Sequence, residues 1–140
     1  RDPDDLLHAA RGGRRLSFRR DAGGVEDGRG NRWALAGDRA ALDLETTPAG
    51  VRSGAYPNAL ERLEGLLLCV NAGEAVASAA PGVEFMDAGG SSHAGGSHGS
   101  LHACDSLVPL VTAGVDTTGL PPEPSITDIY GLALLSLIHI

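Results

Sequence analysis

The most constraining feature of this sequence is a loop-like stretch at residues 87–114. It is rich in glycine and serine, contains His93, His98 and His102, and leads into an apolar run at residues 107–112. Small residues let a backbone turn tightly around a bound ion or phosphate, and imidazoles supply metal ligands. We therefore expect a ligand-binding loop here, with the rest of the chain arranged as its scaffold.

The hydrophobic core of this chain is expected to be thin. A length of 140 residues allows one modest domain, or part of one. With 20 glycines and only 4% aromatic residues, the chain has few large side chains to pack. If the chain is a sheet cut from a larger α/β domain, we expect it to leave an exposed sheet edge and an uncovered apolar face when it stands alone, and therefore to be marginally stable or prone to aggregation.

Charge is distributed unevenly along the chain. All 11 basic residues are arginines and the last is Arg62, whereas acidic residues continue to Asp128. Nucleic-acid binding needs clustered cations, so the net charge of -7 argues against such a partner. The second half is anionic and better suited to attract cations. No apolar run approaches the length of a membrane span, so we expect no membrane partner, and nothing in the sequence indicates a compartment.

The first third of the chain predicts short strands. Two runs, residues 6–10 and 15–19, flank Gly12-Gly13 and predict a β-hairpin. Beyond the hairpin, the residue pattern predicts a turn region and two further strands, at residues 21–31, 32–36 and 40–44. Arginines in these strands are interpreted as a solvated face, with a clamp for an anionic substrate as the alternative.

The rest of the chain predicts helices alternating with strands. Prolines and glycines at residues 46–57 mark the best internal boundary, after which Asn58 is expected to cap a helix that extends to Val70. Ser125 and Asp128 predict the start of a last helix through a capping-box pattern. The stretches expected to be strands are residues 74–80, 83–86 and 107–111. Pro109 cannot donate a ladder hydrogen bond, so the third of these is expected at a sheet edge or a bulge.

The six C-terminal residues, Leu135–Ile140, are interpreted as a tail that does not belong to the natural protein. They are what the codons CTG TCT CTT ATA CAC ATC encode, which resembles the end of a transposase-based sequencing adapter. An ordinary apolar helix end is the alternative. Neither reading gives His139 a functional role.

A specific pattern surrounds His98. Residues 97–101 read Ser-His-Gly-Ser-Leu, a polar spacer with Asp105 follows, and residues 107–111 read Leu-Val-Pro-Leu-Val before Gly114. This string resembles the last metal-binding segment of the alkaline phosphatase superfamily, in its nucleotide pyrophosphatase/phosphodiesterase-like branch. In that branch a Thr-His-Gly or similar turn presents a zinc-ligating histidine, and a Val-Pro-Leu/Phe-Ile strand then leads to a small-residue turn. Further similarity lies at residues 56–62, 79–85 and 125–129, so the resemblance covers most of residues 55–135.

The resemblance implies a fold class and a division of the chain. The fold class is α/β, with the chain forming the C-terminal portion of an alkaline-phosphatase-like α/β sheet domain that is preceded by β-hairpin elements and is incomplete here. Residues 1–52 would form the hairpin segment, residues 53–134 the phosphohydrolase part with the histidine loop, and residues 135–140 the tail.

The resemblance also implies a reaction. Two divalent metals, typically zinc, would assist the hydrolysis of a phosphate-ester small molecule, either a phosphodiester or a phosphomonoester. His98 occupies the position of a metal ligand. Residues 1–86 supply no convincing match to the nucleophile or to the other ligands, so we expect the chain by itself to have no phosphatase turnover.

The other polar residues near His98 are given separate roles. Asp87 and His93 could orient His98 or contact substrate, since a metal-bound imidazole donates its second N–H to an acceptor. His102 and Asp105 are expected to be structural, and Ser97 and Ser100 lack an identifiable base for a nucleophile's role.

The last predictions concern the two cysteines and the alternative functions of the chain. Cys69 and Cys104 match no spaced zinc motif and are too few for a disulfide framework, so two idle or buried free thiols are expected. The alternative function is a non-catalytic module whose Gly/Ser/His loop is structural or binds metal weakly. A related metal-dependent phosphomutase is a further possibility and would differ in its product.

Overall fold

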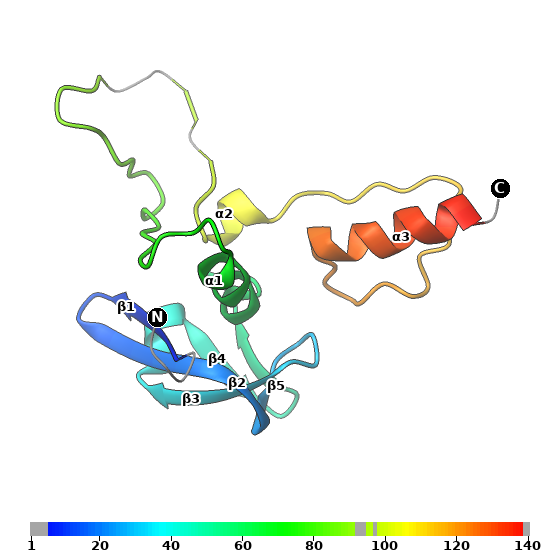
Figure 1. Cartoon of the computed structure of the whole chain (residues 1–140), viewed down its shortest axis with the longest axis horizontal. Coiled ribbons are helices and arrows are strands. Elements are labelled where there is room, and N and C mark those ends of the chain that lie inside the picture. The colour runs from blue at the N-terminus through cyan, green and yellow to red at the C-terminus, as the bar shows by residue number, and fades with distance from the viewer. Residues whose placement is uncertain (1–5, 92–94, 97, 139–140) are drawn as a thin grey trace. The chain divides into compact units, whose positions relative to one another are not determined.

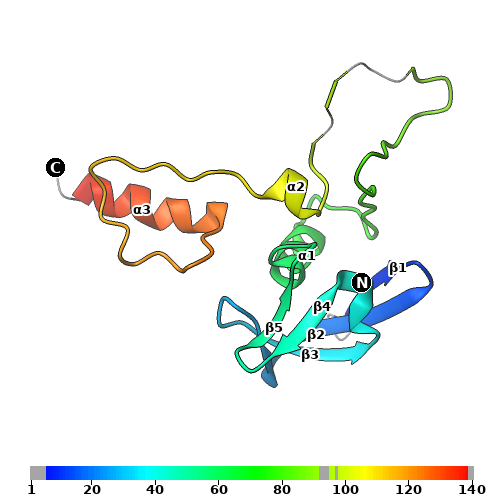
Figure 2. The same cartoon turned by 180° about the vertical axis from the view of Figure 1, so that it is seen from behind.

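The computed structural model describes residues 6–91, 95–96 and 98–138, which belong to two compact units, Arg1–Val108 and Pro109–Ile140 (Figure 1). The described part contains two small antiparallel sheets and three α-helices. This mixed helix and strand content is compatible with a small α/β fold. All of the strands belong to the first unit, where α1 lies beside the sheets in both views (Figures 1 and 2).

The larger sheet contains three antiparallel strands in the order β1-β2-β3, formed by Leu7–Arg11, Arg14–Glu26 and Arg32–Gly37. The turn between β1 and β2 consists of Gly12 and Gly13, which have φ values of 57° and 80°. Positive φ at both central residues is the requirement of a tight hairpin turn, and glycine meets it without steric cost. The hairpin predicted around this glycine pair is confirmed.

Strand β2 is longer than the sequence predicts. The region expected to be a turn at residues 21–31 continues the strand as far as Glu26, with a shift of register between Arg20 and Val25, and only the segment from Asp27 to Asn31 turns. At Gly24 an added Cβ would lie 2.2 Å from the carbonyl oxygen of Trp33. The bulge therefore needs glycine, and it allows the strand to continue where composition suggests a loop.

The segment after β3 also differs from the prediction. Residues 40–44 were expected to be a strand, but Arg39–Leu42 form the short 3-10 helix η1, and its N-cap Asp38 accepts a hydrogen bond of 2.9 Å from the backbone N–H of Ala40. This local bond competes with strand formation. Two further strands, β4 at Leu44–Thr47 and β5 at Gly50–Ser53, then form a hairpin that the sequence pattern does not reveal.

The core of the first unit is built from both sheets, η1 and the start of α1, which spans Ala59–Leu68. Its largest fully buried side chains include Phe18 and Trp33, whose rings meet edge to face with centroids 6.0 Å apart. The buried apolar residues are Leu16, Phe18, Trp33, Ala41, Leu42, Val51, Ala59 and Leu60. This set is small, as expected for a chain with few aromatic residues.

Helix α1 confirms the helix predicted after Asn58. It ends at Leu68 rather than at Val70, and the side chains of Leu66 and Leu68 are exposed. Asn58 precedes the helix without a side-chain capping bond, because its backbone takes the left-handed conformation with φ of 54°. The predicted helix is therefore present, but the predicted cap is not.

Three predicted strands are not formed. Residues 74–80, 83–86 and 107–111 are described, and none of them lies in a strand or a helix. Many of their apolar side chains are exposed, including Phe85, Met86, Val108 and Val111. A strand needs a neighbour to accept and donate its backbone hydrogen bonds, and the described residues provide none for these segments. The uncovered apolar surface expected from the sequence is thus present.

The second unit contains the last helix, α3, which spans Ile126–Ile138. The backbone N–H of Ser125 donates to Asp128 Oδ2 at 2.6 Å, and the N–H of Thr127 donates to Ser125 Oγ at 3.5 Å. These bonds confirm the predicted capping pattern. In the part of the chain that the structure describes, no helix is both long and apolar enough to cross a membrane.

Candidate functional site

His98 lies in a segment without regular secondary structure and is exposed to solvent. Gly99 follows it with φ of 95°, a conformation that glycine adopts readily. Positive φ at this position is therefore taken by a glycine, and the described residues 98–100 form an irregular segment with no hydrogen-bonded turn of their own. His93 and Ser97, which were also considered at the sequence level, lie outside the described residues.

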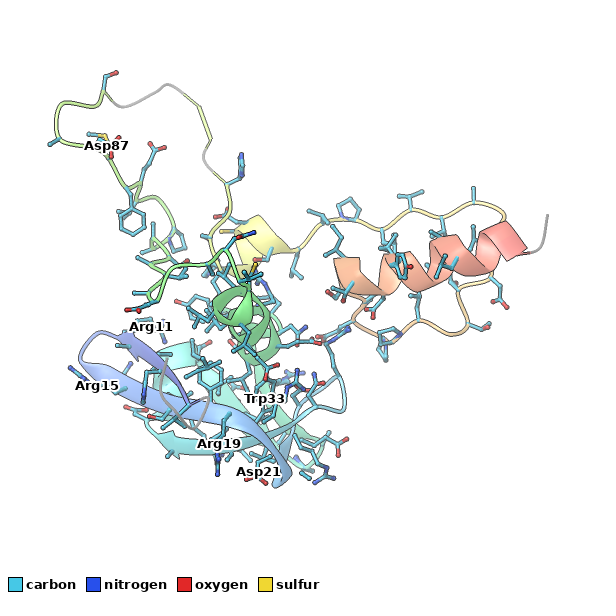
Figure 3. All side chains as sticks on the ribbon, in the orientation of Figure 1. Arg11, Arg15, Arg19, Asp21, Trp33 and Asp87 are labelled. Atoms are coloured by element: carbon cyan, nitrogen blue, oxygen red, sulfur yellow. The ribbon has the colours of Figure 1, made fainter. Side chains whose placement is uncertain are left out.

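Asp87 is likewise exposed, and it belongs to a turn of its own (Figure 3). Its backbone carbonyl accepts a hydrogen bond of 2.9 Å from Gly90 N–H, and Gly89 takes a positive φ of 92°. Among the described residues, no hydrogen bond or ion pair joins the carboxylate of Asp87 to His98. The two predicted site residues are therefore not brought together by a direct bond.

The chain directly after His98 is firmly attached to the first unit. Leu101 packs against the hydrophobic core, and its N–H donates to Ser78 Oγ at 2.9 Å. Its carbonyl accepts a hydrogen bond from Arg62 Nη1 at 3.1 Å. Two residues later, the N–H of Ala103 donates to the carbonyl of Ala55 at 2.8 Å. The downstream end of the loop is thus fixed by contacts to segments far away in sequence.

His102 has the structural role expected from the sequence. It caps the short helix α2, Ala103–Ser106, where its Nδ1 accepts a hydrogen bond of 3.3 Å from Cys104 N–H. Its ring also meets the ring of Tyr56 edge to face, with centroids 5.8 Å apart. Through its Nδ1 atom and its ring, His102 therefore makes structural contacts at the downstream end of the loop.

Asp105 and Cys104 form a small polar pair on α2. A side-chain hydrogen bond from Ser100 is the main cause that lowers the pKa of Asp105 below its ordinary value. Desolvation, followed by the hydrogen bond to Asp105, raises the pKa of the Cys104 thiol. A raised pKa keeps the thiol protonated and poorly nucleophilic. Both Cys69 and Cys104 are free, as predicted, but they are exposed rather than buried.

The described residues do not complete a metal site. Among them, no group of three or more histidine, cysteine, aspartate or glutamate side chains is placed to hold a metal ion. Catalytic zinc is held by about three protein ligands. His98 could supply one of them, so any site built on it would need further ligands from outside the described part.

Sequence reasoning missed the residues that attach the loop. Arg62 was noted only as the last basic residue and as the end of the similar stretch at residues 56–62, and Ser78 only as part of a predicted strand. Neither position carries a motif, because a hydrogen bond between residues 39 apart in sequence leaves no local pattern. Only the folded arrangement reveals the attachment.

The chain was compared with protein families, curated proteins and solved structures. No protein-family model matches the chain, and no curated protein or solved structure is significantly similar to it.

Proposed function

We propose that this chain is part of a metal-dependent phosphohydrolase of the alkaline phosphatase superfamily, in its nucleotide pyrophosphatase/phosphodiesterase-like branch. The substrate class is a small phosphodiester or phosphomonoester. One observation carries the proposal, namely the Ser-His-Gly-Ser-Leu string at residues 97–101, with the Leu-Val-Pro-Leu-Val run and a small-residue turn at the spacing typical of that branch.

Two features of the folded chain support this proposal. The imidazole of His98 is exposed and therefore accessible to an ion. It lies three residues before Leu101, whose hydrogen bonds hold the downstream end of the segment that carries His98. A ligand presented from a fixed backbone is what a metal site requires, since loosely held ligands lose coordination geometry.

The proposed role of this chain within the enzyme is limited. His98 binds one metal, while the nucleophile and the other ligands come from other parts of the full-length protein. The metals, when bound, offset charge on the phosphate oxygens and lower the pKa of an oxygen nucleophile. Under this proposal the 140-residue chain alone has no turnover, because residues 1–86 supply no convincing match to the nucleophile or to the other metal ligands.

Substitution of His98 in the full-length protein tests the proposal. We expect His98→Ala to abolish hydrolysis of a p-nitrophenyl phosphate ester and to reduce the content of zinc-like ions from two per chain, because an imidazole ligand is removed. His8→Ala is the matched control, since His8 is an exposed histidine on β1. Unchanged metal content and rate in His98→Ala would exclude His98 as a ligand.

A second candidate is a non-catalytic module in which the loop is structural or binds metal weakly. The observation in its favour is the lack of any three-residue metal-binding cluster among the described residues. For such a module, metal analysis of the full-length protein would find fewer than two ions per chain, and the protein would not hydrolyse the ester. The same experiment therefore separates the two candidates.

A further inference from the structure

Arg62 lies on α1 and is partly buried, yet in the described part of the chain it forms no ion pair with a carboxylate. Its Nη1 atom instead donates to two backbone carbonyls, those of Pro57 at 3.2 Å and Leu101 at 3.1 Å. Burying a guanidinium is costly unless its donors are satisfied. Here the donor is satisfied by joining the start of α1 to the segment that carries His98.

Leu101 is the point at which several restraints meet. Its N–H donates to Ser78 Oγ, its carbonyl accepts from both Arg62 and Ser106 Oγ, and its side chain packs against the core. Each of these restraints alone is weak, on the order of 1 kcal/mol for a hydrogen bond. Together they hold one residue from four directions, so its backbone position is defined.

The fixed position of Leu101 limits where His98 can lie. Three residue steps separate the two, and a fully extended chain spans at most about 3.6 Å per residue. The Cα atom of His98 therefore stays within about 11 Å of the Cα atom of Leu101. That distance limit comes from the covalent chain and does not change, but if Leu101 lost its restraint it would itself move relative to the core, and the imidazole of His98 would explore a larger volume.

We infer that Arg62 is a positioning residue for the segment that carries His98, acting through the carbonyl of Leu101. The inference rests on the proposed function in one respect only, namely that His98 is a metal ligand whose position matters. The restraint itself belongs to this chain and can be measured without metal or substrate.

Amide hydrogen exchange on the 140-residue chain tests the restraint. Arg62→Met keeps the aliphatic stem and removes the donors, whereas Arg62→Lys keeps a charged donor. In Arg62→Met we expect exchange at the amides of Leu101 and Ala103 to accelerate by about tenfold, with partial recovery in Arg62→Lys. Exchange in β2 and β3 and the emission of the buried Trp33 should remain unchanged. Arg19→Met, at an exposed arginine of β2, is the control and should change none of these (Figure 3).

Backbone ¹⁵N relaxation measures how the substitution of Arg62 changes the mobility of His98 and Gly99 themselves. The order parameters of His98 and Gly99 should fall in Arg62→Met and recover partly in Arg62→Lys, since they depend on the fixed end at Leu101. A purely structural role for Arg62 would not change them selectively. Acceleration of exchange in β2 and β3 in parallel with Leu101 would show general destabilisation and overturn the positioning role, as would no change at Leu101.

Ser78→Ala provides a second test that leaves α1 untouched. It removes the acceptor for Leu101 N–H, so exchange at Leu101 should accelerate in the same direction but by less than in Arg62→Met. No change at Leu101 would contradict the restraint. Failure of the proposed function gives a different result, because His98→Ala in the full-length protein would then leave metal content unchanged while Arg62→Met still releases Leu101.

Discussion

The indole Nε1 of Trp33 donates a hydrogen bond of 2.7 Å to Oδ2 of Asp27, inside the core of the first unit. Asp27 is the buried charged residue of this core, with 9% of its surface exposed. Its carboxylate also accepts from the backbone N–H groups of Arg29 and Asn31, at 2.9 and 3.0 Å, and from the Asn31 side chain. The Asp27 side chain therefore holds the turn between β2 and β3 in place and accepts the hydrogen bond of the buried indole N–H of Trp33.

Asp27→Ala should be among the most destabilising single substitutions in the chain. It removes all four acceptor contacts and leaves the indole N–H of Trp33 without its partner. A buried donor left unsatisfied costs about 1–3 kcal/mol, so a total loss of roughly 3 kcal/mol is expected. Denaturant unfolding followed by Trp33 emission measures it. Asp21→Ala, which removes an acceptor for Gly23 N–H, is the control, and an equal loss in both variants would contradict the role of Asp27.

Gly50→Ala should destabilise the fold by roughly 3 kcal/mol, through strain and a clash together. Gly50 has φ of 115°, and an added Cβ would lie 2.1 Å from the carbonyl oxygen of Glu26. Gly12→Ala is the matched control, because Gly12 also has positive φ, 57°, but has open space around it. There only conformational strain remains, about 1–2 kcal/mol. Thermal unfolding of both variants should show the larger loss for Gly50→Ala.

Arg20 and Glu64 should show measurable coupling. Arg20 contacts Glu64 Oε2 through both Nε and Nη2 at 2.7 Å, and its guanidinium lies 4.1 Å from the centroid of the Trp33 ring. A double-mutant cycle with Arg20→Met and Glu64→Gln should give about 1 kcal/mol, decreasing with salt. The exposed pair Arg14–Asp38, at 3.5 Å, should give a coupling energy near zero in the corresponding cycle. Similar coupling energies in both cycles would show that the partial burial of the Arg20–Glu64 pair does not strengthen it.

Asp105 should titrate below the ordinary range of an aspartate, and Ser100 should be the main reason. Because the folded pKa is lowered, the carboxylate favours the folded segment above the unfolded pKa of about 3.9, and this contribution is lost as the pH falls through the folded value. Ser100→Ala should raise the pKa of Asp105 in a ¹³C NMR titration of the carboxyl group. The pKa of Asp116, lowered mainly by the backbone N–H of Thr118, should not move. An unchanged Asp105 pKa in Ser100→Ala would exclude the hydrogen bond as its cause.

The local elements of this fold could be predicted where residues interact with near neighbours. The glycine pair at residues 12 and 13 specified the first hairpin, helical spacing specified α1, and Ser125 with Asp128 specified the start of α3. The structural role of His102 was also anticipated. A turn that presents His98 was suggested by the sequence pattern alone, and the structure shows an irregular segment there. The part of His98 in metal binding stays a prediction.

Tertiary structure decided the features that depend on distant partners. Strand β2 continues through a glycine-rich stretch because Gly24 can approach Trp33, whereas residues 107–111 stay without strand structure because no described strand pairs with them. The contact of Arg62 with Leu101 joins residues 39 apart and leaves no local signal. Hairpin turns, helix spacing and caps are short-range and were determined by the sequence itself. Pairing, burial and the fixed end of the segment that carries His98 depend on contacts between distant residues, so only the folded chain could decide them.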